Sequence, residues 1–495
     1  MTLDPTPYDA VAYPTFANPE SHPDRMAAIA ILHGLRPAPV ERCRVLEIAC
    51  NDGGNLIPMA YGLPHSEFVG FDLAPSPIQR GQKRVDSLGL TNIQLFAGNL
   101  MNVGPELGRF DYIVAHGLYS WIPDAVRDRL MALCGELLNE NGIAYVSYEA
   151  LPGAYVRLLT RDIMKLGTKQ IMNPEERVAQ ARALLKAVQA ARPEGELYWK
   201  VIQTQLESME KRGVEPVFHD ELGDEYHPVL FSQFAAHAGR HGLQYLSDAM
   251  LPPANDPGTQ PAFEGVLNQL LSGDELEREQ MRDFARMRPF RETLLCRSGS
   301  VVHRQPDAED LEQLLVATQC KSSPGRAAGR RVYTAPGGAR LETDHVGVIA
   351  LMNALETANP HAVSLKELAP HIAMGGLALD QEGIGTLMQL VAARLIAFHA
   401  WNAPMARQIA GQPQASKAAR QEAETLPAVT TLTHLKFVLK DPAIVQLLPL
   451  LDGARDRAAL LDALMSAAAG MPQDEVELVL DRNLALLYRS GLLEA

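Results

Sequence analysis

Short runs of apolar residues recur through the first 150 positions, and each run stops at a polar residue or a glycine. Between these runs, apolar residues recur every three or four positions, as at Leu130, Leu133 and Leu137. The first pattern is typical of buried strands and the second of amphipathic helices. Their alternation predicts an α/β fold, in which helices cover both faces of a parallel sheet. The predicted strands cover residues 45–47, 68–71, 93–96, 112–115 and 142–147.

Beyond about residue 155 the pattern becomes helical, and later it changes again to short helices and short strands. After residue 307, the hairpin signal Pro336-Gly337-Gly338 and trios of short helices indicate winged-helix-like modules. The predicted divisions are a Rossmann-like domain at 1–160, a helical connection at 161–213, a mixed helical middle domain at 214–299 and a winged-helix-like region at 307–495, with an exposed linker near 411–424.

One segment holds the clearest chemical signal. The first strand contains Glu47, and the chain then turns through Gly53 and Gly54 into a helix near Asn55. Such a loop at the carboxyl end of a parallel strand is how nucleotide-like cofactors are held. Asp72, at the end of the second strand, is placed to accept hydrogen bonds from both hydroxyls of an adenosine ribose. The alternative is an α/β domain whose glycines only form turns.

The same loop indicates which cofactor is expected. A nicotinamide dinucleotide site normally shows Gly-x-Gly-x-x-Gly, but Ala49 and Asn51 occupy the first two glycine positions. A diphosphate would therefore have less room at the turn. Asparagine tolerates the left-handed backbone conformation better than other non-glycine residues. We interpret the substitutions as compatible with a working site for another adenosine-containing cofactor.

Composition narrows the classes of function. With 495 residues the chain is long enough for about three domains. The net charge of −14 disfavours a nucleic-acid partner. No apolar run is long enough for a membrane span, and the N-terminus lacks a signal pattern, so a cytoplasmic location without membrane insertion is expected. Five cysteines form no Cys-x-x-Cys pair, and His237 and His241 have no evident third ligand, so no metal is expected.

The order of these signals resembles the class I methyltransferases that use S-adenosylmethionine. Glu47 and its loop match the first motif of that family, Asp72 the second, Asn99-Leu100 the third and Phe110-Asp111-Tyr112 the fourth. The sequence departs from the usual pattern at Ala49, Asn51 and Asn99. The resemblance implies that S-adenosylmethionine is bound by Tyr13, Glu47, Ala49, Asn51, Gly53, Asn55, Asp72, Leu73, Asn99, Leu100 and His116.

A narrower resemblance involves nearly the whole chain. The stretches 116–123 and 148–155, together with Tyr8-Asp9 and His22-Pro23-Asp24-Arg25, are similar to bacterial protein lysine methyltransferases of the type that modifies outer membrane protein B in rickettsiae. That family carries a methyltransferase regulatory domain and a C-terminal winged-helix region. The resemblance implies methyl transfer to lysine side chains of a protein or peptide partner, and a homodimer is one possible assembly.

The carboxyl ends of parallel strands gather functional side chains. We therefore expect His116, Tyr119 and Trp121, after the fourth strand, to form the methyl-transfer face, with Tyr13 or Tyr148 closing it. The alternative for Tyr119 and Trp121 is packing under the following helix. Two other functions remain open: a small-molecule N- or O-methyltransferase, and a regulator that binds the cofactor without catalysis.

Overall fold

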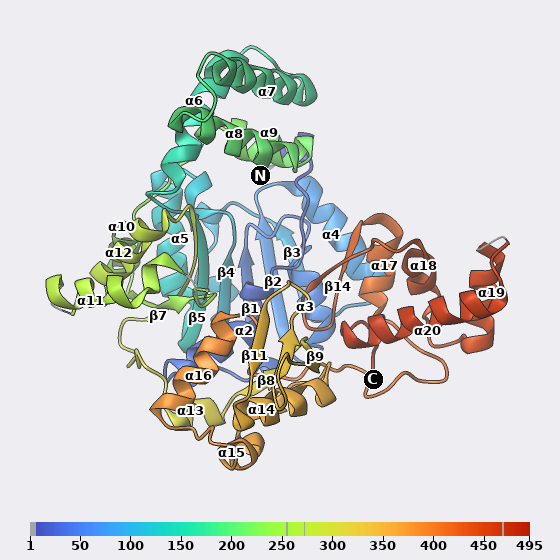
Figure 1. Cartoon of the computed structure of the whole chain (residues 1–495). Coiled ribbons are helices and arrows are strands. Elements are labelled where there is room, and N and C mark those ends of the chain that lie inside the picture. The colour runs from blue at the N-terminus through green and yellow to red at the C-terminus, as the bar shows by residue number, and fades with distance from the viewer. Residues whose placement is uncertain (1–5, 254–255, 272, 468–469) are drawn as a thin grey trace.

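The computed structural model describes residues 6–253, 256–271, 273–467 and 470–495. Its centre is a seven-stranded sheet with helices on both faces, and further units pack around it (Figure 1). Within the described ranges, the structure holds no helix with the length and apolar character that a membrane span requires.

The strand order of the sheet is β3-β2-β1-β4-β5-β7-β6. Neighbours among the first five strands are parallel, whereas β7 is antiparallel to both β5 and β6. All five strands predicted from the sequence are present, and the α/β fold class is confirmed. The strands are β1 (Arg44–Ile48), β2 (Glu67–Asp72), β3 (Ile93–Ala97), β4 (Phe110–Ala115), β5 (Leu138–Glu149), β6 (Leu243–Asp248) and β7 (Phe290–Arg297).

Apolar residues fill consecutive positions of β1 because helices cover both faces of the sheet. Successive residues of a strand point to opposite faces. Val45 packs into the core under one helical layer, and Leu46 packs into the core under the other. The first layer is α2 (Pro23–Leu32), α3 (Leu56–Gly62) and α4 (Pro75–Leu88), and the second includes α5 (Asp124–Leu137) and α10 (Phe231–Arg240).

The last two strands come from the segment 214–299, which the sequence suggested as a middle domain. β6 lies at the edge of the sheet, and β7 inserts between β6 and β5. The two strands are joined through α11 (Pro261–Leu270) and α12 (Glu275–Arg286). This segment therefore completes the sheet that residues 44–149 begin, rather than standing apart from it.

Four helices follow β5 in the chain, ahead of α10 and β6. They are α6 (Ala154–Thr168), α7 (Pro174–Ala190), α8 (Leu197–Glu210) and α9 (Val214–Leu222). Figure 1 shows them above the edge of the sheet at which β1, β2, β4 and β5 end. They share an apolar core that includes Met164, Leu185 and Leu206. We call these four helices the roof.

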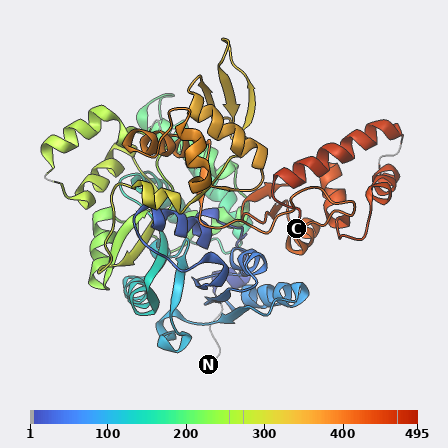
Figure 2. The same cartoon turned by 90° about the horizontal axis from the view of Figure 1, so that it is seen from below.

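Two smaller units follow β7. The first contains α13 (Ala308–Glu312), α14 (Val346–Ala358), α15 (Leu365–Ala373), α16 (Gln381–Ala392) and strands β8 (Leu315–Ala317), β9 (Lys321–Pro324), β10 (Arg331–Thr334), β11 (Arg340–Thr343), β12 (Val363–Ser364) and β13 (Ala397–His399). The predicted hairpin is confirmed, because β10 pairs antiparallel with β11. In Figure 2 this unit lies beside α2, whose Ala28 and Leu32 join its core.

The second unit contains α17 (Lys417–Thr425), β14 (Ala428–Thr430), β15 (Lys436–Val438), α18 (Pro442–Leu447), α19 (Arg457–Ala467) and α20 (Gln473–Arg489). The exposed linker predicted near 411–424 is not what the structure shows there. Most of α17 lies in this range, and Ala419 and Ala423 are buried in the core of the unit. The alanine and lysine content that suggested a linker is that of a short amphipathic helix.

A buried junction joins the start of α2, the loop after β1 and the second C-terminal unit. His22 caps α2, accepting from the backbone N–H of Asp24 at 3.1 Å. Its ring lies 5.0 Å from the ring of His434 and 5.8 Å from that of Trp401. Burial lowers the pKa of His22 to about 4 and the pKa of His434 well below its usual value. Both imidazoles are therefore neutral in the folded protein at pH 7.

This burial predicts that acid weakens the fold. Between pH 6.5 and about 4 the unfolded chain protonates His22 while the folded chain does not, so stability present above pH 6.5 is lost as the pH falls. His22→Asn keeps an acceptor for the helix cap and removes the titrating ring. Urea unfolding should show that the variant loses about 2 kcal/mol less than the wild type between pH 7.5 and pH 5.

The matched control is His371→Asn, because His371 lies on an exposed part of α15. It should keep the pH dependence of the wild type. An unchanged pH dependence in His22→Asn would contradict the buried, neutral state of this histidine.

Candidate active site

The loop after β1 has the backbone of a glycine-rich loop although two of its positions are not glycine. Ala49, Asn51 and Gly53 have φ values of 61°, 51° and 71°, all in the left-handed region. This conformation costs an L-residue about 1–2 kcal/mol, and asparagine bears it better than alanine. The substitutions noted in the sequence therefore preserve the shape of the loop at an energetic cost.

Asp72 fixes this loop from the end of β2. Its two carboxylate oxygens accept hydrogen bonds from the backbone N–H groups of Asn51, at 2.8 Å, and Ala74, at 2.9 Å. Burial raises the pKa of Asp72, although both backbone donors act in the opposite direction. The structure thus places Asp72 beside the loop. The neighbouring Leu73 is 45% exposed.

Glu47 is the one carboxylate that β1 brings to the base of the loop. Its Oε1 accepts from the side-chain amide of Asn55 at 2.8 Å, while its buried Oε2 has no hydrogen-bond partner in the described part of the chain. Burial raises the pKa of Glu47 to about 8. The buried Oδ1 of Asn51 also lacks a partner within the described residues. Unsatisfied buried polar atoms at a cofactor loop fit a site that a polar ligand completes.

The third motif lies at the end of β3. Asn99 caps a short helical turn there, because its side-chain oxygen accepts from the backbone N–H of Met101 at 2.9 Å. Leu100, the next residue, is 8% exposed and packs into the core on the α5 side. The role predicted for both residues beside an adenine stays a prediction.

The N-terminal segment, residues 7–21, contacts both the roof and the sheet. Tyr8 stacks on His219 of α9 with 4.3 Å between ring centres, and Tyr13 donates to Asp220 at 3.3 Å. At the same time Asp9 accepts from the backbone N–H of Ser76, at 3.0 Å, in the first turn of α4. Tyr13 therefore contacts the roof, and its predicted role in closing over a bound cofactor stays a prediction.

Beside the loop, polar side chains from separate parts of the chain meet around Tyr145. Its hydroxyl accepts from the Asn18 side-chain amide at 2.9 Å, donates to Glu292 at 2.6 Å and lies 2.9 Å from Nδ1 of His116. The backbone N–H of Asn18 donates to Asn55 at 2.8 Å, which connects this group to the loop. We call Asn18, His116, Tyr145 and Glu292 the polar centre.

His116 is exposed to solvent, yet protein surrounds it closely enough that desolvation lowers its pKa to about 4. The ring is therefore neutral at pH 7. Ser147 lies 3.3 Å from its Nδ1, and Phe290 faces it edge-on at 6.2 Å between ring centres. Of the residues predicted for the methyl-transfer face, His116 is the one that the structure places in the polar centre.

Tyr119 and Tyr148 lie elsewhere, which corrects the position expected for them. Both are buried in the core under α5 and α10, where Tyr148 stacks on Phe234 at 4.0 Å. The Tyr119 hydroxyl is 2.8 Å from Nδ1 of His237. Packing on the far face of the sheet, which was the alternative interpretation for Tyr119, accounts for both side chains.

Trp121 lies at the base of the roof. Its ring is 5.0 Å from that of Tyr226, and the guanidinium groups of Arg157 and Arg161 lie over it at 5.4 and 5.6 Å. Arg157 also pairs with Glu149 at the end of β5, at 2.8 Å. Trp121 therefore joins the roof to the sheet through cation–π contacts. Its predicted catalytic role stays a prediction.

Sequence analysis missed three members of the polar centre. Tyr145 and Glu292 lie inside apolar strands, and Asn18 lies in an irregular segment, so no local pattern distinguishes them from packing residues. Glu20, close to Glu292, was missed for the same reason. Its pKa is raised by burial and by the Glu292 carboxylate.

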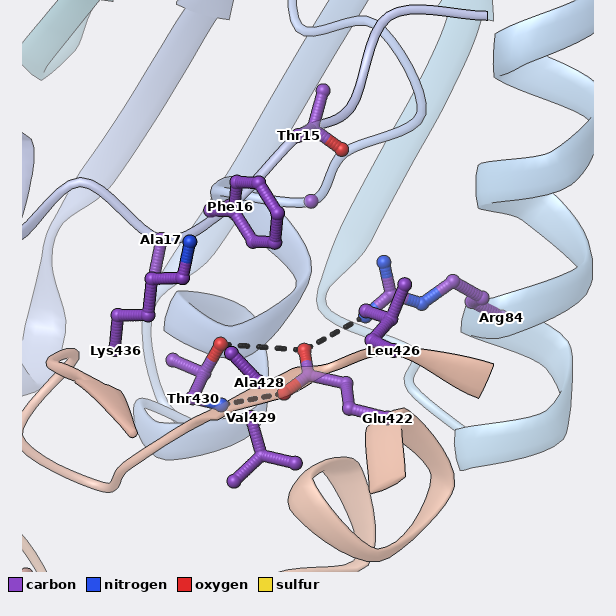
Figure 3. A pocket seen from close by; sticks show the side chains of 11 residues that line it. Thr15, Phe16, Ala17, Arg84, Glu422, Leu426, Ala428, Val429, Thr430 and Lys436 are labelled. Atoms are coloured by element: carbon purple, nitrogen blue, oxygen red, sulfur yellow. Dashed lines mark hydrogen bonds and ion pairs between the residues drawn. The ribbon is translucent and has the colours of Figure 1, made fainter. Parts of the chain in front are cut away.

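The second C-terminal unit contacts the loop from the other side (Figure 3). Lys436 lies 3.5 Å from the centre of the Phe16 ring, and Arg84 of α4 pairs with Glu422 of α17 at 3.0 Å. These residues line a pocket of only about 10 Å³ that Gly54 also borders. A Cβ on Gly54 would lie 2.2 Å from the Thr15 hydroxyl, so glycine is required there.

His237 of α10 and His241, which follows the end of that helix, share a third group that the sequence did not reveal. His237 and His241 lie 3.2 and 2.9 Å from the same carboxylate oxygen of Asp128 on α5. The short distances are those of hydrogen bonds, which also lower the pKa of Asp128. This group ties α10 to α5 on the face of the sheet away from the polar centre.

The sheet order with one antiparallel strand, the acidic residues on β1 and β2 and the left-handed loop between them are those of the class I S-adenosylmethionine-dependent methyltransferase fold. Three family models match the chain: a methyltransferase domain at residues 45–142, a predicted methyltransferase regulatory domain at 215–297 and the PKMT C-terminal winged-helix domain at 411–477. The chain belongs to the bacterial methyltransferase family that carries this regulatory domain.

Two relatives come from Rickettsia prowazekii, and both are uncharacterized proteins. RP028 is 30% identical over 240 residues, which cover 48% of this chain and 96% of RP028. RP789 is 34% identical over 312 residues, which cover 63% of this chain but only 56% of RP789. The chain thus spans little more than half of that longer relative.

The whole architecture is similar to that of PKMT2 from Rickettsia typhi. The TM-score is 0.85 at 24% identity, and the match covers 97% of this chain and all of the other. PKMT2 has also been solved in complex with AdoHcy, and that structure matches equally well, at 23% identity. At these identities the likeness shows a shared fold, including the regulatory and winged-helix regions.

The unpartnered Glu47 oxygen leads to a prediction about cofactor binding. At pH 7 a carboxyl group with a pKa of about 8 is mostly protonated, and pairing with the ammonium group of S-adenosylmethionine would drive the proton off. Calorimetry at pH 7 in two buffers with different ionisation enthalpies should therefore detect proton release on binding. Glu47→Gln should abolish this release and weaken binding about tenfold.

Glu67→Gln is the control, because Glu67 is an exposed residue at the start of β2. That variant should bind and release the proton as the wild type does. The same proton release in Glu47→Gln would show that another group is its source.

Proposed function

We propose that the protein transfers the methyl group of S-adenosylmethionine to lysine side chains of a protein substrate. The observation that supports this most is the pair of carboxylates, Glu20 and Glu292, beside the polar centre and next to the cofactor loop. An acceptor site with two carboxylates attracts a cationic amine more strongly than a neutral hydroxyl. The roof and the two C-terminal units offer a docking surface of the size that a protein substrate uses.

The cofactor supplies an electrophilic methyl group on a sulfonium when it is bound. The residues of this chain have two tasks: to orient the lysine nitrogen, and to remove its proton, because an ammonium group has no free electron pair. Lysine has a reference pKa of about 10.4, and burial lowers that value. The Tyr145 hydroxyl and the neutral His116 ring can position the amine by hydrogen bonds, since both already lie in one network.

Glu292 is placed to take part in the proton transfer. It accepts from the Tyr145 hydroxyl at 2.6 Å, and that hydroxyl lies against His116. A proton that leaves the amine can reach Glu292 through Tyr145 without crossing the core. Proximity and orientation supply much of the rate of a group transfer, so the network acts mainly by holding the amine in line with the methyl group. The cytoplasmic location and a homodimer stay predictions.

The first test of the proposal uses the full chain, S-adenosylmethionine labelled in its methyl group and a bacterial lysate. Label should appear in protein bands, and mass spectrometry should place it on lysine side chains. Label confined to small molecules would favour a small-molecule methyltransferase instead. No label at all, in a preparation that binds the cofactor, would favour a regulator without catalysis.

The second test separates the polar centre from the tyrosines of the core. Tyr145→Phe keeps the ring and removes the hydroxyl that joins His116 to Glu292, so the turnover number should fall at least tenfold. Affinity for S-adenosylhomocysteine should stay within threefold, because Tyr145 does not contact the loop after β1 directly.

Tyr148→Phe is the matched control on the same strand. Its hydroxyl accepts only from Thr293, at 3.3 Å, among the described residues, so turnover should stay within threefold of the wild type. Lower turnover in Tyr148→Phe together with normal turnover in Tyr145→Phe would contradict the role of the polar centre. It would favour the catalytic residues expected from the sequence.

A further inference from the structure

A cavity of about 430 Å³ lies between α2, the segment after β6 and the two C-terminal units. Its walls include apolar side chains of α2, such as Ile29 and Leu32, and polar residues at one end. In Figure 2 the α2 helix runs between the sheet and the first C-terminal unit, which is where this cavity lies. Of its lining residues, only Glu20 takes part in the reaction proposed above.

Two arginines on the wall lack carboxylate partners. Arg25 donates to the backbone carbonyl of Phe398 at 3.0 Å, and Arg394 donates to that of Leu251 at 3.1 Å. Within the described residues, neither guanidinium forms an ion pair with an acidic side chain. Arg25 is half-buried and Arg394 is exposed, and each guanidinium has further N–H donors with which it can bind a ligand in the cavity.

Burial lowers the pKa of Arg394, the Glu20 carboxylate raises it, and the charge of Arg25 lowers it. The two arginines therefore lie near one carboxylate of the same cavity wall. Arg394 lies just after the end of α16 with a φ of 60°, a position that usually holds glycine. A backbone outlier of this kind is a reason to look for a ligand.

The cavity adjoins the polar centre through the short turn at residues 19–21. Glu20 lines the cavity, and the charge of Glu292 is close enough to raise its pKa. The backbone N–H of Glu20 is 3.3 Å from the side-chain oxygen of Asn18, a member of the polar centre. Glu20 thus borders both the polar centre and the cavity that holds the two arginines.

We infer that this cavity holds the part of a protein substrate next to the methylated lysine, and that Arg25 and Arg394 bind an acidic side chain there. The inference rests on the proposed function, since it assigns the lysine itself to the polar centre. Arginine forms paired, charge-assisted hydrogen bonds with carboxylates, which gives specificity as well as affinity. The expected substrate therefore carries Asp or Glu within a few residues of the target lysine.

The test measures binding of two fluorescent peptides to the full chain in the presence of S-adenosylhomocysteine. One peptide has a central lysine flanked by glutamates, and the other has glutamines in their place. Anisotropy should show at least tenfold tighter binding of the glutamate peptide. Arg394→Gln and Arg25→Lys should reduce that preference to less than threefold.

Arg326→Gln, a change in the exposed loop between β9 and β10, is the control and should keep the full preference. Equal binding of the two peptides, no binding of either, or a preference that survives Arg394→Gln would overturn the inference. Unchanged affinity for S-adenosylhomocysteine checks that each variant is folded.

Methyl transfer to the same peptides is measured separately. Peptides that bind with the expected preference but receive no label would count against the proposed function and not against the cavity. Labelled lysine in both peptides, without a preference for acidic flanks, would count against the cavity and not against the proposed function.

Discussion

The side-chain amide of Asn55 is the interaction on which the rest of the site depends. Its nitrogen donates to Glu47 and to Ser21, and its oxygen accepts from the backbone of Asn18 and from His434. All four bonds are buried or partly buried, so each loss would leave an unpaired polar group at a cost of about 1–3 kcal/mol. One side chain thereby joins the sheet, the N-terminal segment and the second C-terminal unit at the cofactor loop.

The bonds of this amide explain how segments far apart in the sequence meet at one small site. Asn18 can reach Tyr145 and His116 only because its backbone is held against Asn55. His434, which lies more than 370 residues away in sequence, forms a hydrogen bond with the side-chain oxygen of the same Asn55 amide. The C-terminal unit is therefore part of the support of the cofactor loop.

The sequence predicted the parts of the fold that local pattern determines. Buried parallel strands must be apolar on both faces, so β1 to β5 were visible as continuous apolar runs. The same reasoning located Glu47 and Asp72, which end such runs. It could not assign β6 and β7 to that sheet, because a roof of four helices and the segments beyond it separate them from β5 in the chain. The segment 411–424 resembled a linker because it is rich in Gln, Ala and Lys, a composition that also suits a short amphipathic helix such as α17.

The polar centre was harder to predict for a physical reason. In the sequence, Tyr145 is flanked by the apolar residues of a buried strand. Only the pairing of β5 with β7 brings Glu292 to it. Tyr148 faces the opposite side of the sheet because side chains alternate along β5, and Tyr119, in the turn after β4, packs against it on that side. Which face a side chain occupies depends on register, and a single sequence does not determine register between strands that lie far apart.

The central claim is that the cofactor loop is a site assembled by three parts of the chain around Asn55. The most direct measurement is a calorimetric titration of the full chain and of His434→Ala with S-adenosylhomocysteine. The account predicts one binding site per wild-type chain and binding that is several-fold weaker in His434→Ala, with the folded far-ultraviolet circular dichroism spectrum retained. Equal affinity in the two proteins, or no binding by the wild type, would contradict it.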